Sequence, residues 1–182
     1  MPGRLMSVVT IMDKRFELFI PHEKIIDAVG KIADSINKEL ANKDVLFLGI
    51  LNGAFMFASD LIRRIQFNCT ISFLKLASYT GTSSTNEIKS LIGLNEDIRG
   101  KTVVIIEDII DSGHTIENLL IQLGIHKPDE IKVAALLVKP MNVSKDIKID
   151  YKGFEIPGDF IVGYGLDYNG YGRNLKDIYK LI

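Results

Sequence analysis

The fold is decided by one stretch of the sequence, Val103-Val104-Ile105-Ile106-Glu107-Asp108-Ile109-Ile110-Asp111-Ser112-Gly113-His114-Thr115. A turn at Gly100-Lys101 precedes it, and its continuous apolar beginning predicts a strand over Thr102–Ile106. Strands that are apolar on both faces are typical of parallel sheets covered by helices. A helix is predicted from about Thr115 to Leu123, so the stretch reads as strand, polar turn and helix.

The polar part of this stretch has two chemically different halves. Glu107 and Asp108 are adjacent carboxylates at the predicted end of a buried strand, where ribose hydroxyls and a hydrated Mg²⁺ are suitable partners. Asp111-Ser112-Gly113-His114-Thr115 then leads into a helix, and small residues there let backbone N–H groups form an anion nest. The helix N-terminus adds partial positive charge, so a terminal phosphate is expected to bind there. Without a ligand, the same residues would form only an acidic turn and a capped helix.

Strands and helices alternate through the middle of the chain. Helices are predicted over about 22–41 and Ala54–Ile65, and strands over Val45–Leu51, Thr70–Ser78 and Ile131–Val138. Further strands are predicted within Met6–Ile20, near Phe160–Tyr164 and at Ile178–Ile182. This order predicts an α/β fold with an open, mostly parallel sheet flanked by helices. Ligands bind beyond the carboxyl ends of such strands, where Asn52-Gly53, Ser78-Tyr79 and Lys139 follow the apolar runs.

Composition narrows the class of protein. The chain has 182 residues, enough for one domain with a sizeable core, and its net charge of −1 does not favour a nucleic-acid partner. No apolar stretch approaches the roughly 20 residues that a membrane span needs. We expect no signal peptide and a cytoplasmic location, because no charged start precedes a long apolar run. The single cysteine, Cys69, fits a reducing compartment and speaks against a structural zinc site.

Residues 103–115 closely resemble the phosphoribosyl-pyrophosphate binding motif of type I phosphoribosyltransferases. That motif has four apolar residues, two acids, two apolar residues, then Asp-Ser/Thr-Gly and a phosphate-binding end. From about Lys43 to Asn174 the chain is similar to hypoxanthine-guanine phosphoribosyltransferases. The resemblance implies one domain over residues 1–182, with a core of about 22–150 and a small hood from about 1–20 and 151–182.

The resemblance also implies a pyrophosphate site. Leu51-Asn52-Gly53 resembles the family's pyrophosphate loop, in which a non-proline peptide bond is often cis. Many relatives have a basic residue where this chain has Asn52, so backbone contacts are expected to matter more here. Arg173 resembles the basic residue that meets pyrophosphate, and Ser78-Tyr79 resembles the start of the lid over the reacting sugar.

Four residues resemble the purine-binding part of the family's site. Lys139 corresponds to the lysine that donates to the oxygen at position 6 of the base, and Phe160 to the aromatic that stacks on it. Ile161 is expected to offer backbone groups to the base edge. Asp167 resembles a Mg²⁺ ligand, together with Glu107 and Asp108, and lies near the part that reads position 2 of the base.

The expected reaction joins hypoxanthine or guanine to phosphoribosyl pyrophosphate, with Mg²⁺ as cofactor, giving IMP or GMP and pyrophosphate. Asp111 is expected to act as the general base at N7, while the ribose phosphate contacts Glu107, Asp108 and residues 111–115. By analogy with relatives, we expect a homodimer or homotetramer. The competing hypotheses are a transferase for another base, a regulatory protein that binds RNA, and an interaction module without activity.

Overall fold

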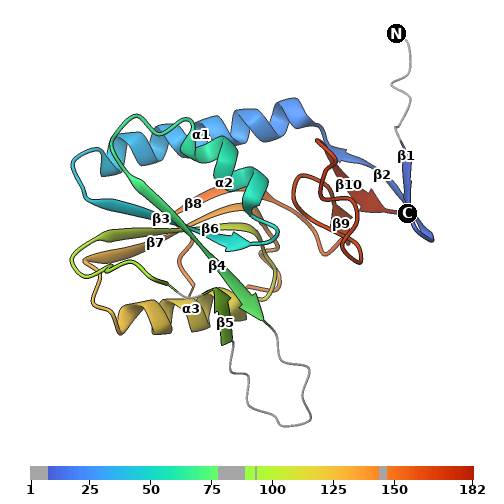
Figure 1. Cartoon of the computed structure of the whole chain (residues 1–182). Coiled ribbons are helices and arrows are strands. Elements are labelled where there is room, and N and C mark those ends of the chain that lie inside the picture. Colours follow the sequence, from blue (N-terminus) through green and yellow to red (C-terminus); the bar gives the residue numbers. More distant parts are fainter. Residues whose placement is uncertain (1–7, 78–88, 93, 144–146) are drawn as a thin grey trace.

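The computed structural model describes residues 8–77, 89–92, 94–143 and 147–182 (Figure 1). The predicted lid residues Ser78 and Tyr79 lie outside the described residues. The elements are, in chain order, β1 (Val8–Ile11), β2 (Lys14–Ile20), α1 (His22–Leu40), β3 (Val45–Leu51), α2 (Phe55–Ile62), β4 (Thr70–Ala77), β5 (Lys89–Ile92), β6 (Thr102–Ile110), α3 (His114–Gly124), β7 (Glu130–Val138), β8 (Tyr151–Glu155), β9 (Ile161–Val162) and β10 (Ile178–Leu181).

The larger sheet has six strands in the order β5-β4-β3-β6-β7-β8. Strands β4, β3, β6, β7 and β8 are parallel, and β5 is antiparallel to β4 at one edge. The predicted α/β class with an open, mostly parallel sheet is therefore confirmed. Figure 1 shows α1 and α2 on one face of the sheet and α3 on the other.

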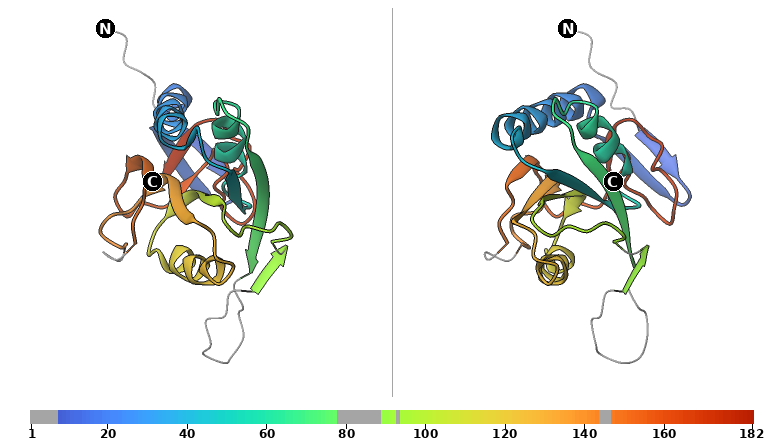
Figure 2. Two further views of the ribbon diagram at one scale, coloured as in Figure 1. Left: turned by 90° about the vertical axis from the view of Figure 1, so that its left-hand side faces the viewer. Right: turned by 60° about the vertical axis from the view of Figure 1, so that its left-hand side comes forward.

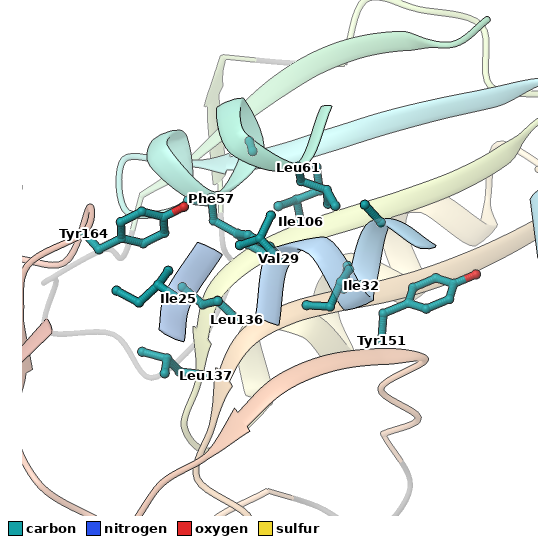
Figure 3. Close-up of a cluster of buried hydrophobic side chains, with 14 of the residues drawn as sticks. Ile25, Val29, Ile32, Phe57, Leu61, Ile106, Leu136, Leu137, Tyr151 and Tyr164 are labelled. Atoms are coloured by element: carbon teal, nitrogen blue, oxygen red, sulfur yellow. The ribbon is translucent and has the colours of Figure 1, made fainter. Parts of the chain in front are cut away.

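The central strands bury side chains on both faces, which explains their continuous apolar sequences. In β6, Val104 and Ile106 belong to the cluster under α1 and α2, whereas Val103 and Ile105 belong to the cluster under α3. This alternation is the two-residue period of a strand. Figure 3 shows the first cluster, in which Ile25 and Val29 of α1 lie near Phe57 of α2 and Ile106 of β6.

The hood is a second sheet, made from both ends of the described chain. Its four strands have the order β1-β2-β10-β9 and all pair antiparallel. Both pictures place it at one end of the larger sheet (Figures 1 and 2). Tyr164, which follows β9, donates a 2.6 Å hydrogen bond to Asp60 Oδ2 in α2 and so ties the hood to the core.

Four local expectations need correction. Tyr151–Glu155 is β8 of the larger sheet, so the hood begins after Glu155 and not at about residue 151. Strand β6 extends to Ile110 instead of ending at Ile106, because β7 continues alongside it and pairs with it up to Val138. Strand β5 was not predicted, and α2 ends at Ile62, earlier than expected. Within the described residues no helix is long and apolar enough to cross a membrane.

Candidate active site

The adjacent acids of β6 lie inside the strand, close to the end of β3. Asp108 is only 9% exposed, and its Oδ1 accepts a 2.8 Å hydrogen bond from the backbone N–H of Ile109. Glu107 Oε2 is buried and has no hydrogen-bond partner among the described residues. Burial raises the pKa of Glu107 well above its usual value, and the nearby charge of Asp108 raises it further. Burial also raises the pKa of Asp108, although the Ile109 N–H and the charge of Arg173 oppose this. A buried acceptor without a partner is costly, so this pair is suited to a ligand that donates hydrogen bonds or carries positive charge.

The turn after β6 has the geometry expected of an anion site. Gly113 has φ +85°, and a Cβ at this position would lie 2.3 Å from Ile147 Cδ1, so both conformation and space favour glycine. Helix α3 begins at His114 without a side-chain cap, which leaves backbone N–H groups of its first turn available. Ser112 Oγ lies 2.9 Å from His114 Nδ1 and belongs to the same turn. An exposed, uncapped helix N-terminus after a left-handed glycine can bind a phosphate group.

Asp111 is held by two donors that come from the end of β7. Lys139 Nζ is 2.8 Å from Asp111 Oδ2, and Asn142 Nδ2 is 2.6 Å from Asp111 Oδ1. The hydrogen bond from Lys139, followed by that from Asn142, lowers the pKa of Asp111 below its usual value. The lowered pKa keeps this carboxylate ionised at neutral pH, and the Asp111 side chain, which is 52% exposed, is accessible to a ligand. An ionised carboxylate beside an ammonium group can recognise a ring that offers both an N–H and a carbonyl oxygen.

The loop after β3 packs against both the acids and the hood. The peptide bond between Leu51 and Asn52 is cis. The resemblance implied that a peptide bond in this loop is often cis. A Cβ at Gly53 would lie 1.7 Å from Asp108 Oδ2, and one at Gly165 would lie 2.1 Å from the Gly53 carbonyl oxygen. Asn52 itself is exposed, so its side chain does not stand in a buried position where relatives would place a charged group. These close approaches bring Leu51-Asn52-Gly53 beside the carboxyl end of β6.

The hood contributes an ion pair and an aromatic group. Arg173 Nη2 is 2.6 Å from Asp167 Oδ1, and Arg173 Nη1 donates to the Gly165 carbonyl oxygen at 2.7 Å. Phe160 is 46% exposed, and its ring meets the Tyr168 ring edge-to-face, with centroids 5.9 Å apart. Ile161 follows it as a buried residue of β9. The half-exposed residue Phe160 is therefore available to stack on a flat ligand.

The three predicted Mg²⁺ ligands, Glu107, Asp108 and Asp167, do not form a ready-made cluster. The described residues hold no group of three or more His, Cys, Asp or Glu side chains that could bind a metal ion by themselves. Asp167 is occupied by Arg173 and by the N–H of Gly170, which donates to Oδ2 at 2.7 Å. Mg²⁺ commonly uses only one or two carboxylates and completes its shell with water and substrate phosphates. The unpartnered Glu107 Oε2 and the neighbouring Asp108 fit that kind of site.

A model of the phosphoribosyl transferase domain matches residues 19–169. This chain belongs to the phosphoribosyltransferase family. It is 36% identical to hypoxanthine phosphoribosyltransferase of Salmonella typhimurium over 94% of this chain and 98% of the relative. It is 39% identical to hypoxanthine-guanine phosphoribosyltransferase of Bos taurus over 89% of this chain and 79% of the relative.

A solved structure of a hypoxanthine-guanine phosphoribosyltransferase from Bacillus anthracis has the same architecture as this phosphoribosyltransferase. Its TM-score is 0.85 at 37% identity, and the match covers 91% of this chain and 98% of that chain. The type I phosphoribosyltransferase fold expected from residues 103–115 is therefore confirmed.

Two residues that contact the predicted site were not predicted to belong to it. Gly165 approaches the loop after β3, and Asn142 contacts Asp111 from the turn after Lys139. Asn142 lies three residues after Lys139, and its backbone N–H donates to the Lys139 carbonyl oxygen at 3.0 Å. A polar residue three positions after Lys139 is the one signal in the sequence that could have indicated a turn pointing back to Asp111.

Proposed function

We propose that this protein transfers the 5-phosphoribosyl group of phosphoribosyl pyrophosphate to N9 of hypoxanthine or guanine, yielding IMP or GMP and pyrophosphate. The observation that carries this proposal is the pairing of Asp111 with Lys139, beside the anion nest of residues 111–115. The nest suits the 5-phosphate, and the pair suits the N7 and O6 edge of an oxopurine. The named relatives support this choice of substrates, because each is called a hypoxanthine or hypoxanthine-guanine phosphoribosyltransferase.

The donor occupies the carboxyl ends of β3 and β6. The N–H groups at the start of α3 and the hydroxyls of Ser112 and Thr115 bind the 5-phosphate. Glu107 and Asp108 accept hydrogen bonds from the ribose hydroxyls or hold Mg²⁺ through oxygen ligands. When bound, Mg²⁺ supplies positive charge that stabilises the departing pyrophosphate. Leu51-Asn52-Gly53 contributes backbone groups and Arg173 a positive charge to the same leaving group. For that role the Arg173 guanidinium rearranges from its ion pair with Asp167.

The acceptor lies between the ends of β6 and β7 and the hood. Lys139 donates to O6, Phe160 stacks on the ring, and Ile161 offers backbone groups to its edge. Asp111 accepts the N7 proton as the N9 lone pair forms a bond to C1 of the sugar. As that bond forms, the C1–O bond breaks and its electrons leave on pyrophosphate, so the sugar has oxocarbenium character in the transition state. Holding both substrates in this arrangement contributes positioning in addition to the proton transfer.

The direct test supplies phosphoribosyl pyrophosphate and Mg²⁺ with hypoxanthine, guanine, xanthine, adenine or uracil in separate reactions. Nucleotide formation and pyrophosphate release are followed together. We expect turnover with hypoxanthine or guanine and little with adenine, which lacks an oxygen at position 6. Preferential use of adenine or uracil would contradict the base assignment, and no turnover with any base would contradict the enzymatic function. RNA retention measured on the same preparation tests the regulatory alternative.

We further propose that the enzyme assembles as a homodimer or homotetramer and acts in the cytoplasm. The proposed assembly rests on analogy with phosphoribosyltransferases of the same fold. The single partly buried cysteine, Cys69, is compatible with a reducing compartment. Light scattering coupled to size-exclusion chromatography measures the assembly, and a monomer at assay concentration would contradict it.

A further inference from the structure

One short turn, residues 139–142, makes two hydrogen bonds to the Asp111 carboxylate and a third to the backbone of the preceding residue, Ile110. The Lys139 backbone N–H donates to the Ile110 carbonyl oxygen at 2.9 Å, which fixes the turn beside the strand end that carries Asp111. Lys139 Nζ then binds Asp111 Oδ2, and Asn142 Nδ2 binds Asp111 Oδ1. The backbone N–H of Asn142 closes the turn on the Lys139 carbonyl oxygen. Each carboxylate oxygen therefore has its own donor, and both donors belong to residues 139–142.

The two donors are not equivalent once a base is bound. This step rests on the proposed function, in which Lys139 Nζ donates to O6 of the purine. When Lys139 Nζ turns toward O6, its hydrogen bond to Asp111 Oδ2 weakens. Asp111 must present an oxygen to N7 at the same time. The amide of Asn142 has no assigned contact with either substrate and is free to stay on Oδ1. Among charged groups of the described residues, only Lys139 acts on the carboxylate of Asp111.

We propose that Asn142 is a positioning residue, which keeps the Asp111 carboxylate oriented toward N7 while Lys139 engages the base. A carboxylate oxygen can accept more than one hydrogen bond, so the Asn142 contact leaves Asp111 able to accept the N7 proton. The amide is uncharged, and it therefore fixes the geometry without adding a second cation that would hold the proton acceptor too tightly. Asn142 is exposed in the turn, so its replacement should leave the fold intact.

The variants Asn142→Ala and Asn142→Asp separate a positioning role from a structural one. Asn142→Asp keeps the shape but replaces the donor with a carboxylate that repels Asp111. Losing a hydrogen bond to a charged group is expected to lower kcat about tenfold for Asn142→Ala, and more for Asn142→Asp, while KM for phosphoribosyl pyrophosphate changes little. Met141→Ala is the matched control, because Met141 lies in the same turn and is 93% exposed. It should keep the wild-type kcat.

The second readout is the titration of the Asp111 carboxyl group, followed by NMR in the protein without substrates. Loss of the Asn142 donor should raise the pKa of Asp111 toward its usual value, and Asn142→Asp should raise it further. The acid limb of the kcat/KM profile should move in the same direction. Unchanged kcat and unchanged Asp111 titration in Asn142→Ala would overturn the proposal. An inactive wild-type protein would instead contradict the proposed function, whatever the titration shows.

Discussion

Gly53 packs directly against the carboxylate of Asp108, so closely that a Cβ at position 53 would lie 1.7 Å from Asp108 Oδ2. This contact joins the loop after β3 to the acidic end of β6. Gly53→Ala must displace a buried side chain, and we expect it to cost about 1–3 kcal/mol in the free energy of unfolding. Because displacement of site groups by about 1 Å can cost on the order of a hundredfold in rate, transferase activity should fall by a similar factor.

Denaturant unfolding and steady-state kinetics measure these two effects. Gly30→Ala in α1 is the matched control, because a Cβ at position 30 has nothing within 4 Å. This control should keep full activity and gain about 0.5–1 kcal/mol of stability from better helix propensity. A Gly53→Ala protein as active as wild type would show that the contact does not constrain the site.

Asp111→Asn tests the proposed proton acceptor. An amide cannot take the N7 proton, so kcat should fall by about a hundredfold or more, within the range of general-base contributions. Donor binding should weaken far less, because the anion nest is formed mainly by backbone N–H groups. Single-turnover rates and equilibrium binding of phosphoribosyl pyrophosphate separate the two quantities. Turnover equal to wild type would remove Asp111 from the catalytic role.

Lys139→Ala tests recognition of the base. Loss of a charged hydrogen bond to O6 is worth roughly 1.5–3 kcal/mol, so KM for hypoxanthine and guanine should rise by about one to two orders of magnitude. Donor affinity should stay near the wild-type value. Lys152→Ala, which removes a lysine of β8 with 55% of its side chain exposed, is the control and should leave both constants unchanged. A loss confined to donor affinity would contradict the assignment.

Glu107→Gln tests the electrostatic cost of the acidic pair through pH dependence. Burial raises the pKa of Glu107 above its ordinary value of 4.5, so the folded protein retains a proton that the unfolded chain releases. The contribution of Glu107 to stability is therefore fully present below about pH 4.5 and is lost as the pH rises through the folded-state pKa. Glu107→Gln should accordingly become more stable than wild type as the pH rises from 4 to 8, in urea unfolding with a chelator present.

Asp111→Asn should show the opposite pH dependence of the free energy of unfolding in the same experiment. The pKa of Asp111 is lowered by Lys139 and Asn142, so its contribution to stability is present at neutral pH and lost as the pH falls through the folded-state pKa.

A stability advantage of Glu107→Gln that does not change with pH would show that the Glu107 carboxyl group is not destabilised by burial. In both cases transferase activity reports function separately, and Glu107→Gln should weaken donor and Mg²⁺ binding despite its stability.

Several local features of the chain could be predicted from the sequence. The apolar run of Val45–Leu51 predicted β3 with the observed bounds, and the helical spacing after Pro21 predicted α1 to within a residue of its end. These predictions succeeded because burial on two strand faces or on one helix face leaves a repeating pattern in neighbouring residues. The end of β6 was predicted too early, since its last residues are ordered by pairing with β7.

By itself, the sequence determined the fold class, because alternating strands and helices leave repeating local patterns. It also predicted the acidic pair and the anion nest, because each of these is formed by consecutive residues. Only the tertiary structure decided which distant groups meet. Lys139 and Asn142 reach Asp111 from 28 and 31 positions away, because β6 and β7 are neighbours that end at the same edge of the sheet. Gly53 reaches Asp108 because β3 is the other neighbour of β6. Strand order and side-chain direction set these contacts, and no local pattern of residues specifies either.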